Sequence, residues 1–116
     1  MDTVLVVLNV LASLGAAGSS VAGVIRPGLG LRPDEETTTG VRFYTRAYAA
    51  RALPLGLVTA FVLVLGPSAA VVPLLVVSGL AQVGDSALGV MRRNPGMALG
   101  AGAFAVIHLL AAVLWS

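Results

Sequence analysis

Three ionisable side chains lie within apolar stretches of this sequence: Arg51, Asp85 and His108. Asp85 precedes the arginines that close its stretch by about six residues, which in a helix places it roughly 9 Å inside the apolar segment. A carboxylate at that depth is costly unless it is paired, protonated or hydrated. We therefore take the three as candidate catalytic residues. Asp85 would be the general acid or base, Arg51 the charge that polarises it, and His108 a cap on the same pocket.

Polar side chains near Asp85 predict a pocket around it. Tyr44, Tyr48 and Arg51 follow one another at i, i+4 and i+7, which is one face of a helix. Gln82 stands three residues before Asp85 on the same broad face. We expect Tyr44, Tyr48 and Gln82 to bind a ligand in a pocket that opens toward the cytoplasm. The alternative for the tyrosines is an interfacial aromatic belt.

Two interpretations of Arg51 and Asp85 stay open. In one, they form a structural ion pair that fixes the register of two helices, while His108 hydrogen-bonds a backbone carbonyl. In the other, they bind and polarise a lipophilic substrate. Both interpretations need the two side chains to face each other from consecutive antiparallel helices joined by a short turn.

The composition excludes several classes of protein. The chain has 116 residues, of which 58% are hydrophobic and only 10% charged, whereas a soluble domain carries about a quarter charged residues. Because there is no cysteine, disulfides, thiolate catalysis and cysteine-ligated metals are excluded. With a single histidine as well, we expect no metal site and no cofactor.

Apolar runs of about 20 residues predict membrane-spanning helices, since such a run covers the hydrocarbon core of a bilayer. The sequence contains four of them, which predicts an all-α, four-helix transmembrane bundle forming one domain over residues 1–116. The expected spans cover residues 4–25, 44–65, 69–91 and 97–115. The polar segment 26–40 is the only long connection, and it is either a solvated loop or else a lid or partner site.

The arginines indicate the orientation of the chain. All seven lie in or beside the two connections on one side of the bundle, and the other side carries none. By the positive-inside rule, both connections are cytoplasmic and both termini extracytoplasmic in a multi-pass protein of the plasma (inner) membrane. Since these arginines flank spans that contact the lipid bilayer, we expect no nucleic-acid partner.

Small and polar residues predict how the helices pack. Asn9 is the one strongly polar side chain of the first span, and we interpret it as an interhelical hydrogen-bonding group. Gly15 and Gly23 belong to a ridge of small residues spaced four apart, and Gly96 and Gly100 form a second. Such ridges allow close packing within the bundle, against a larger partner, or in a homo-oligomer.

Three short motifs carry a resemblance to a known group of proteins. They are RALPLG with Arg51 and Gly56, QVGDSALGV with Gly84 and Asp85, and His108 in the last span. In these motifs the chain resembles small four-helix bacterial integral membrane proteins, loosely akin to the DoxX-like group. The resemblance implies a four-helix transmembrane fold and no established activity.

Three functions remain open from the sequence. The first is binding of a lipophilic small molecule in the polar pocket, with acid/base chemistry of the isomerase, cyclase or epoxide-opening kind. The second is a proton-coupled transporter subunit, in which the membrane carboxylate carries the proton. The third is a non-catalytic accessory or scaffold protein that packs against a partner through its glycine-rich faces.

Overall fold

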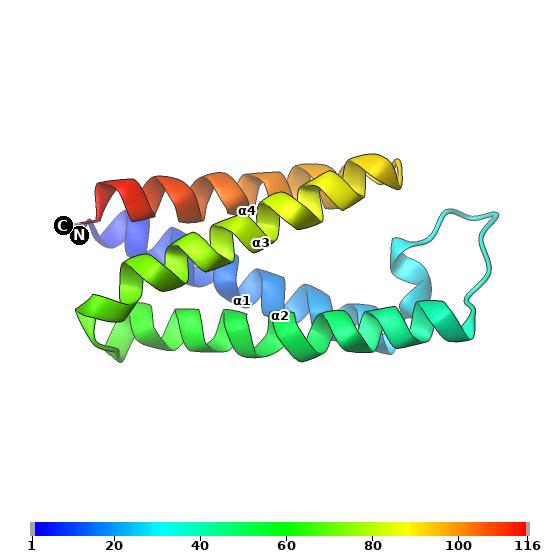
Figure 1. Ribbon diagram of the computed structural model, residues 1–116, viewed down its shortest axis with the longest axis horizontal. Coiled ribbons are helices and arrows are strands. Elements are labelled where there is room, and N and C mark those ends of the chain that lie inside the picture. Colours follow the sequence, from blue (N-terminus) through cyan, green and yellow to red (C-terminus); the bar gives the residue numbers. More distant parts are fainter. Residues whose placement is uncertain (1, 116) are drawn as a thin grey trace.

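The computed structural model describes residues 2–115 as four long helices and no strand (Figure 1). The predicted all-α, four-helix architecture is confirmed. All four helices are long and apolar enough to cross a membrane. The helices are α1 (Thr3–Ile25), α2 (Thr39–Leu65), α3 (Val71–Met91) and α4 (Pro95–Leu114), with short 3-10 turns at Pro27–Gly30 and Ser68–Ala70.

Polar side chains fix the points at which three of the helices begin. Asp2, Thr38 and Asn94 each accept a hydrogen bond from a backbone N–H in the first turn, at 2.8 to 3.1 Å. Such caps satisfy backbone donors that have no partner within the helix. Because of the Thr38 cap, α2 begins at Thr39, five residues before the predicted apolar span. The prediction followed apolar residues and missed this polar first turn.

The outer surface of the bundle is apolar. Phe61, Leu80 and Val113 expose 60%, 60% and 81% of their surface, and many other large apolar side chains face outward with them. In water such a surface would drive association, whereas in a bilayer it contacts lipid tails that are equally apolar. Together with the four spans, it indicates a membrane protein.

The helices pack as two hairpins. α1 packs mainly against α2, and α3 mainly against α4. Two glycines allow these close approaches, because a Cβ at Gly56 would lie 2.5 Å from the Ser13 carbonyl oxygen and one at Gly89 would lie 2.5 Å from the Ala98 nitrogen. Any larger residue at either position must push two helix backbones apart.

The predicted small-residue ridges account for little of this packing. Gly15 does contact another helix, since a Cβ there would lie 3.0 Å from the Phe104 ring. A Cβ added at Gly23 or at Gly100, in contrast, would meet nothing within 4 Å. Packing within the bundle is therefore not seen at these two positions, because spacing alone does not tell which face of a helix meets a neighbour in the same chain. Packing of these positions against a partner or a second copy stays a prediction.

The two hairpins meet at one end of the bundle and diverge toward the other (Figure 1). At the end where residues 2 and 115 lie, here called the terminal end, Leu63, Leu75 and Ala111 form an apolar cluster against which Trp115 packs. The opposite end, here called the loop end, carries the α1–α2 loop (residues 26–38) and the α3–α4 turn (residues 92–94). α2 and α3 separate toward that end, which leaves space between the hairpins.

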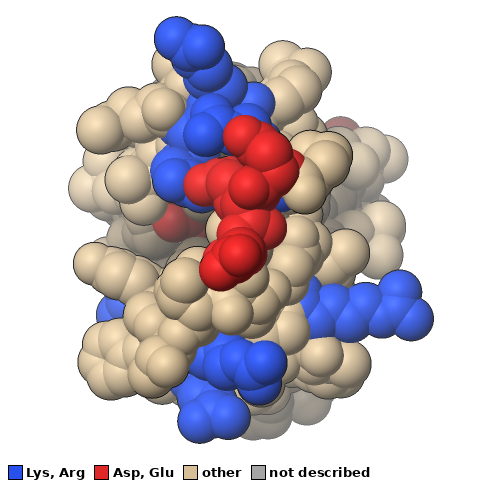
Figure 2. All heavy atoms as spheres, turned by 90° about the vertical axis from the view of Figure 1, so that its right-hand side faces the viewer, with Lys and Arg blue, Asp and Glu red and all other residues tan. Residues whose placement is uncertain are grey.

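An ion pair connects the two hairpins at the loop end. The Arg92 guanidinium donates to Glu35 Oε2 at 2.7 Å, and the Arg32 backbone N–H donates to Glu35 Oε1 at 2.9 Å. Figure 2 shows this end, with a band of acidic side chains between two groups of basic ones. The α1–α2 loop is thus tied to the α3–α4 turn across the gap between the hairpins.

We expect acid to break the ion pair between Glu35 and Arg92 and so to free the α1–α2 loop from the α3–α4 turn. The two hydrogen bonds, with the nearby Arg32 and Arg92 charges, hold the pKa of Glu35 below its usual value. The stabilisation is therefore complete above the ordinary glutamate pKa and is lost as the pH falls through the lowered value. Cysteines introduced at Thr37 and Met91 and spin-labelled should report a longer, broader distance in acid, and Glu35→Gln should show the same change at neutral pH.

The matched control for this experiment is Glu36→Gln. Glu36 is the next residue in the same loop, is exposed, and forms no ion pair in the described part of the chain. Its substitution should leave the distance unchanged. An equal change for both variants would show that loop charge in general, rather than the Glu35 contacts, sets the position of the loop.

Candidate functional site

A cavity of about 500 Å³ lies between the two hairpins and receives residues from all four helices. Its volume is within the range of small-molecule sites in proteins. No residue of the apolar cluster at the terminal end lines it. The lining residues are Ser13, Ala16, Tyr48, Arg51, Ala52, Leu55, Gly56, Ser78, Leu80, Ala81, Gln82, Gly84, Asp85, Ala87, Leu88 and His108.

Three of the predicted site residues meet on the side of the cavity nearer the loop end. Tyr48 donates a hydrogen bond from its hydroxyl to Asp85 Oδ2 at 3.0 Å, which joins α2 to α3. Arg51, one turn after Tyr48, lines the same cavity. Arg51 and Asp85 thus share a cavity, as predicted, but they form no ion pair in the described structure. Tyr48, rather than Arg51, is thus the α2 side chain that is hydrogen-bonded to the Asp85 carboxylate.

The deeper end of the cavity is closed by His108 of α4. Its Nδ1 lies 3.0 Å from Asn9 Oδ1 of α1, and the two side chains are 1% and 0% exposed. Asn9 Nδ2 donates to the Leu5 carbonyl at 2.7 Å, so its Oδ1 is the acceptor for His108. A neutral His108 therefore carries its proton on Nδ1 and keeps Nε2 as an acceptor. The predicted interhelical hydrogen bond of Asn9 is confirmed, and the partner of His108 is a side chain rather than a backbone carbonyl.

A buried hydroxyl in the cavity wall lacks a partner. Ser13 is 2% exposed, and its hydroxyl oxygen is the one buried side-chain polar atom without a hydrogen bond among residues 2–115. Nearby, Thr59 and Ser78 satisfy each other at 3.1 Å between hydroxyl oxygens. An unpaired buried polar group costs about 1–3 kcal/mol. Since Ser13 lines the cavity, a ligand with a hydrogen-bonding group could satisfy it.

The remaining predicted site residues divide between the cavity and the surface. Gln82 is 7% exposed and lines the cavity, where it was expected. Tyr44 does not line it. Its side chain is 76% exposed and lies edge-on to Phe43, with ring centroids 6.4 Å apart. The shared helix face predicted for Tyr44, Tyr48 and Arg51 thus reaches the cavity only from Tyr48 onward.

The sequence contains a signal for Ser13 that its analysis did not use. Ser13 follows Asn9 by four residues and therefore lies on the same face of α1, the face that turns inward. Thr59 gives no comparable signal, because it stands alone in an apolar run. The hydrogen bond between Thr59 of α2 and Ser78 of α3 can be recognised only in the structure, where the two hydroxyls face each other.

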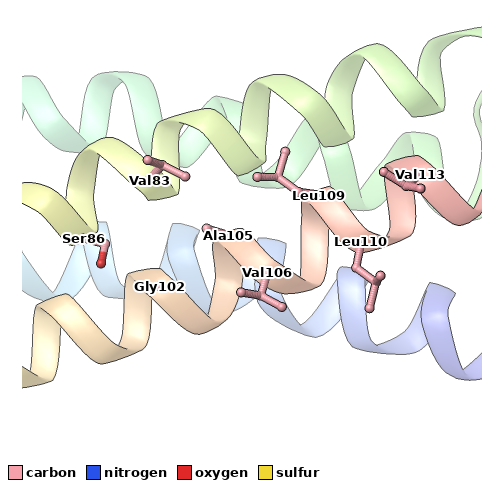
Figure 3. A pocket seen from close by; sticks show the side chains of 8 residues that line it. All are labelled: Val83, Ser86, Gly102, Ala105, Val106, Leu109, Leu110 and Val113. Atoms are coloured by element: carbon pink, nitrogen blue, oxygen red, sulfur yellow. The ribbon is translucent and has the colours of Figure 1, made fainter.

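A second hollow lies between α3 and α4 and differs in chemistry. It has a volume of about 520 Å³, and Figure 3 shows it lined mainly by aliphatic side chains. Its single hydroxyl, from Ser86, already donates to the Ala98 carbonyl at 2.7 Å. The lining of this hollow therefore has no side-chain polar group without a hydrogen bond, and its apolar surface is suited to contact with lipid chains. We do not take it as the candidate site. Its residues are Val83, Ser86, Gly102, Ala105, Val106, Leu109, Leu110 and Val113.

The cavity between the hairpins has the groups for binding and for proton transfer. Asp85 can accept a proton, Tyr48 can donate one, and Arg51 can stabilise a negative charge beside them. No group of three or more histidine or acidic side chains among residues 2–115 is placed to hold a metal ion.

Comparison of the chain with protein-family models, with curated proteins and with solved structures finds no match. The candidate site therefore rests on the residues, distances and burial given above.

Proposed function

We propose that the chain is a membrane protein that binds a lipophilic small molecule in the cavity between its two hairpins. The observation that carries this proposal is the combination of a cavity of ligand size with a buried, unpartnered Ser13 hydroxyl in its wall. Sites for small molecules are mostly apolar with a few placed polar groups. Aliphatic and alanine side chains supply the apolar wall here, and Ser13, Gln82 and His108 supply polar groups.

The position of the cavity fits a ligand that arrives from the lipid or the cytoplasm. On the positive-inside rule we place the arginine-rich loop end in the cytoplasm. The cavity lies on that side of the apolar cluster formed by Leu63, Leu75 and Ala111, so it is a pocket rather than a passage through the bundle. This shape favours binding over transport.

Acid/base chemistry on the bound molecule is the second part of the proposal. Asp85 is the base and Tyr48 the group that shares its proton, because these two are hydrogen-bonded at the cavity wall. A placed acid and base in a pocket shielded from water suffice for an isomerisation or a ring opening.

Photolabelling tests the binding site. A fatty alcohol that carries a diazirine, incorporated with the protein in nanodiscs of zwitterionic lipid, should label cavity-lining residues saturably. Ala52→Trp, which fills the cavity from α2, should remove that labelling. Ala103→Trp places the same bulk on an exposed position outside both hollows and should leave it intact.

The opposite outcome is equally clear. Labelling that spreads over lipid-facing residues such as Val106 and Val113, rises without saturation, and ignores Ala52→Trp would contradict the proposal. The pattern on the unmodified chain decides this even if the tryptophan variant folds poorly.

A further inference from the structure

We infer that the ligand of this cavity is an anionic amphiphile, a carboxylate or phosphate on an apolar chain, and that Arg51 binds its anionic group. This inference rests on the proposed function and adds the chemical class of the ligand. It depends on three observations: the partners of the charged residues, the order of polar and apolar groups along the cavity, and the charge of the loop end.

The first observation is that Arg51 is the one arginine of the described chain that lines the cavity, and that it forms no ion pair there. Asp85, the one carboxylate in the cavity, accepts the hydrogen bond of Tyr48. The ion pairs of the described chain use Arg32 and Arg92, both with Glu35 of the loop. A guanidinium beside an apolar wall gains most from an anion that matches its planar donors, which carboxylates and phosphates do.

The second observation is the order of groups along the cavity. Arg51 lies nearer the loop end, and the next turn of α2 deeper in the bundle presents Leu55 and Gly56 to the same cavity. α3 adds Ala81 from the opposite side, four residues deeper than Asp85. A molecule with its anionic group at Arg51 would therefore place its chain along these apolar side chains, toward the deeper part of the cavity that Ser13 and His108 line.

The third observation is the charge at the loop end. All seven arginines lie in the part of the chain nearer that end, with four of the five acidic residues, the fifth being Asp2 at the terminal end. Figure 2 shows the basic groups spread on both sides of the acidic band. The excess of positive charge raises the local concentration of anions at the mouth of the cavity.

The test compares a medium-chain fatty acid with the fatty alcohol of the same chain length. Each is used to displace the diazirine photoprobe from the protein in zwitterionic nanodiscs, at a pH at which the acid is ionised. The acid should compete about tenfold better, as a charge-assisted hydrogen bond provides. Arg51→Gln should abolish the difference while the alcohol competes as before, and Arg51→Lys should restore part of it.

Arg46→Gln is the matched control. It removes one exposed arginine from the same helix, at a position that does not line the cavity. The preference for the acid should persist in this variant. Equal competition by acid and alcohol in the unmodified protein, or an equal loss in Arg46→Gln and Arg51→Gln, overturns the inference and leaves the proposed function standing. If neither compound competes, the proposed function fails as well.

A further arm identifies the source of the anion. Adding phosphatidylglycerol to the nanodiscs should weaken competition by the fatty acid if a bilayer lipid occupies Arg51, and Arg51→Gln should remove that effect. If the added lipid changes nothing, the ligand is a free amphiphile. Both results support an anion site at Arg51 and differ only in where its ligand originates.

Discussion

Gly56→Ala should destabilise the bundle by about 1–3 kcal/mol, the usual cost of adding atoms to a well-packed contact. The added Cβ would lie 2.5 Å from the Ser13 carbonyl oxygen and 2.9 Å from the Ala17 Cβ. Neither atom belongs to a flexible side chain that can turn away, so α1 and α2 must separate. Equilibrium unfolding in mixed detergent micelles measures the loss.

The control for Gly56 has the opposite expected sign. Gly18 lies on α1 with open space around it, and nothing would contact a Cβ there within 4 Å. Gly18→Ala should stabilise the helix by about 0.5–1 kcal/mol, because alanine loses less backbone entropy than glycine. If both variants stabilise the protein, α1 and α2 do not approach as closely at Gly56 as described.

Asn9→Leu should cost about 1–3 kcal/mol, because it removes the acceptor of a fully buried His108 N–H. His108→Leu should cost a similar amount by stranding the Asn9 amide oxygen. The double variant should recover part of the loss, and a coupling free energy near 1 kcal/mol is expected, as for interhelical hydrogen bonds in membranes. Strictly additive losses would mean that the two side chains do not interact.

Two further measurements separate the hydrogen bond from simple packing. Ser19→Leu places the same leucine on an exposed position of α1 and should cause no comparable loss. The ¹⁵N chemical shifts of His108 should show a protonated Nδ1 and an unprotonated Nε2, since Asn9 Oδ1 is the acceptor. The reverse assignment would mean that the Asn9 amide is turned around.

Residue type and position along the apolar runs were sufficient to predict the fold and to identify several residues that line one cavity; that this cavity is a functional site stays a prediction. Apolar runs of spanning length gave four helices, and Arg51, Gln82, Asp85 and His108 all line one cavity. These predictions depend on the cost of burying polar groups in lipid, which acts on each residue almost independently of its neighbours. The predicted resemblance to DoxX-like proteins stays a prediction.

Pairing between residues was harder to predict, because it depends on how the helices are arranged. Asp85 accepts a hydrogen bond from Tyr48 and forms no ion pair with Arg51, although both α2 side chains line the same cavity. His108 meets Asn9 of the first helix, ninety-nine residues away in the sequence. Short turns join α2 to α3, yet α2 packs mainly against α1. The short turn between α2 and α3 therefore predicted α3 as the main neighbour of α2, whereas that neighbour is α1.

The two-hairpin packing also determines how such a bundle can assemble. Each hairpin joins helices adjacent in the chain, so much of its packing can form as soon as both helices have entered the membrane, without the other half. The cavity lies along the seam between the hairpins. A ligand that binds only when the two hairpins are packed together stabilises that packed state relative to the separated hairpins, by mass action. The bound molecule would then hold the two halves of the chain together.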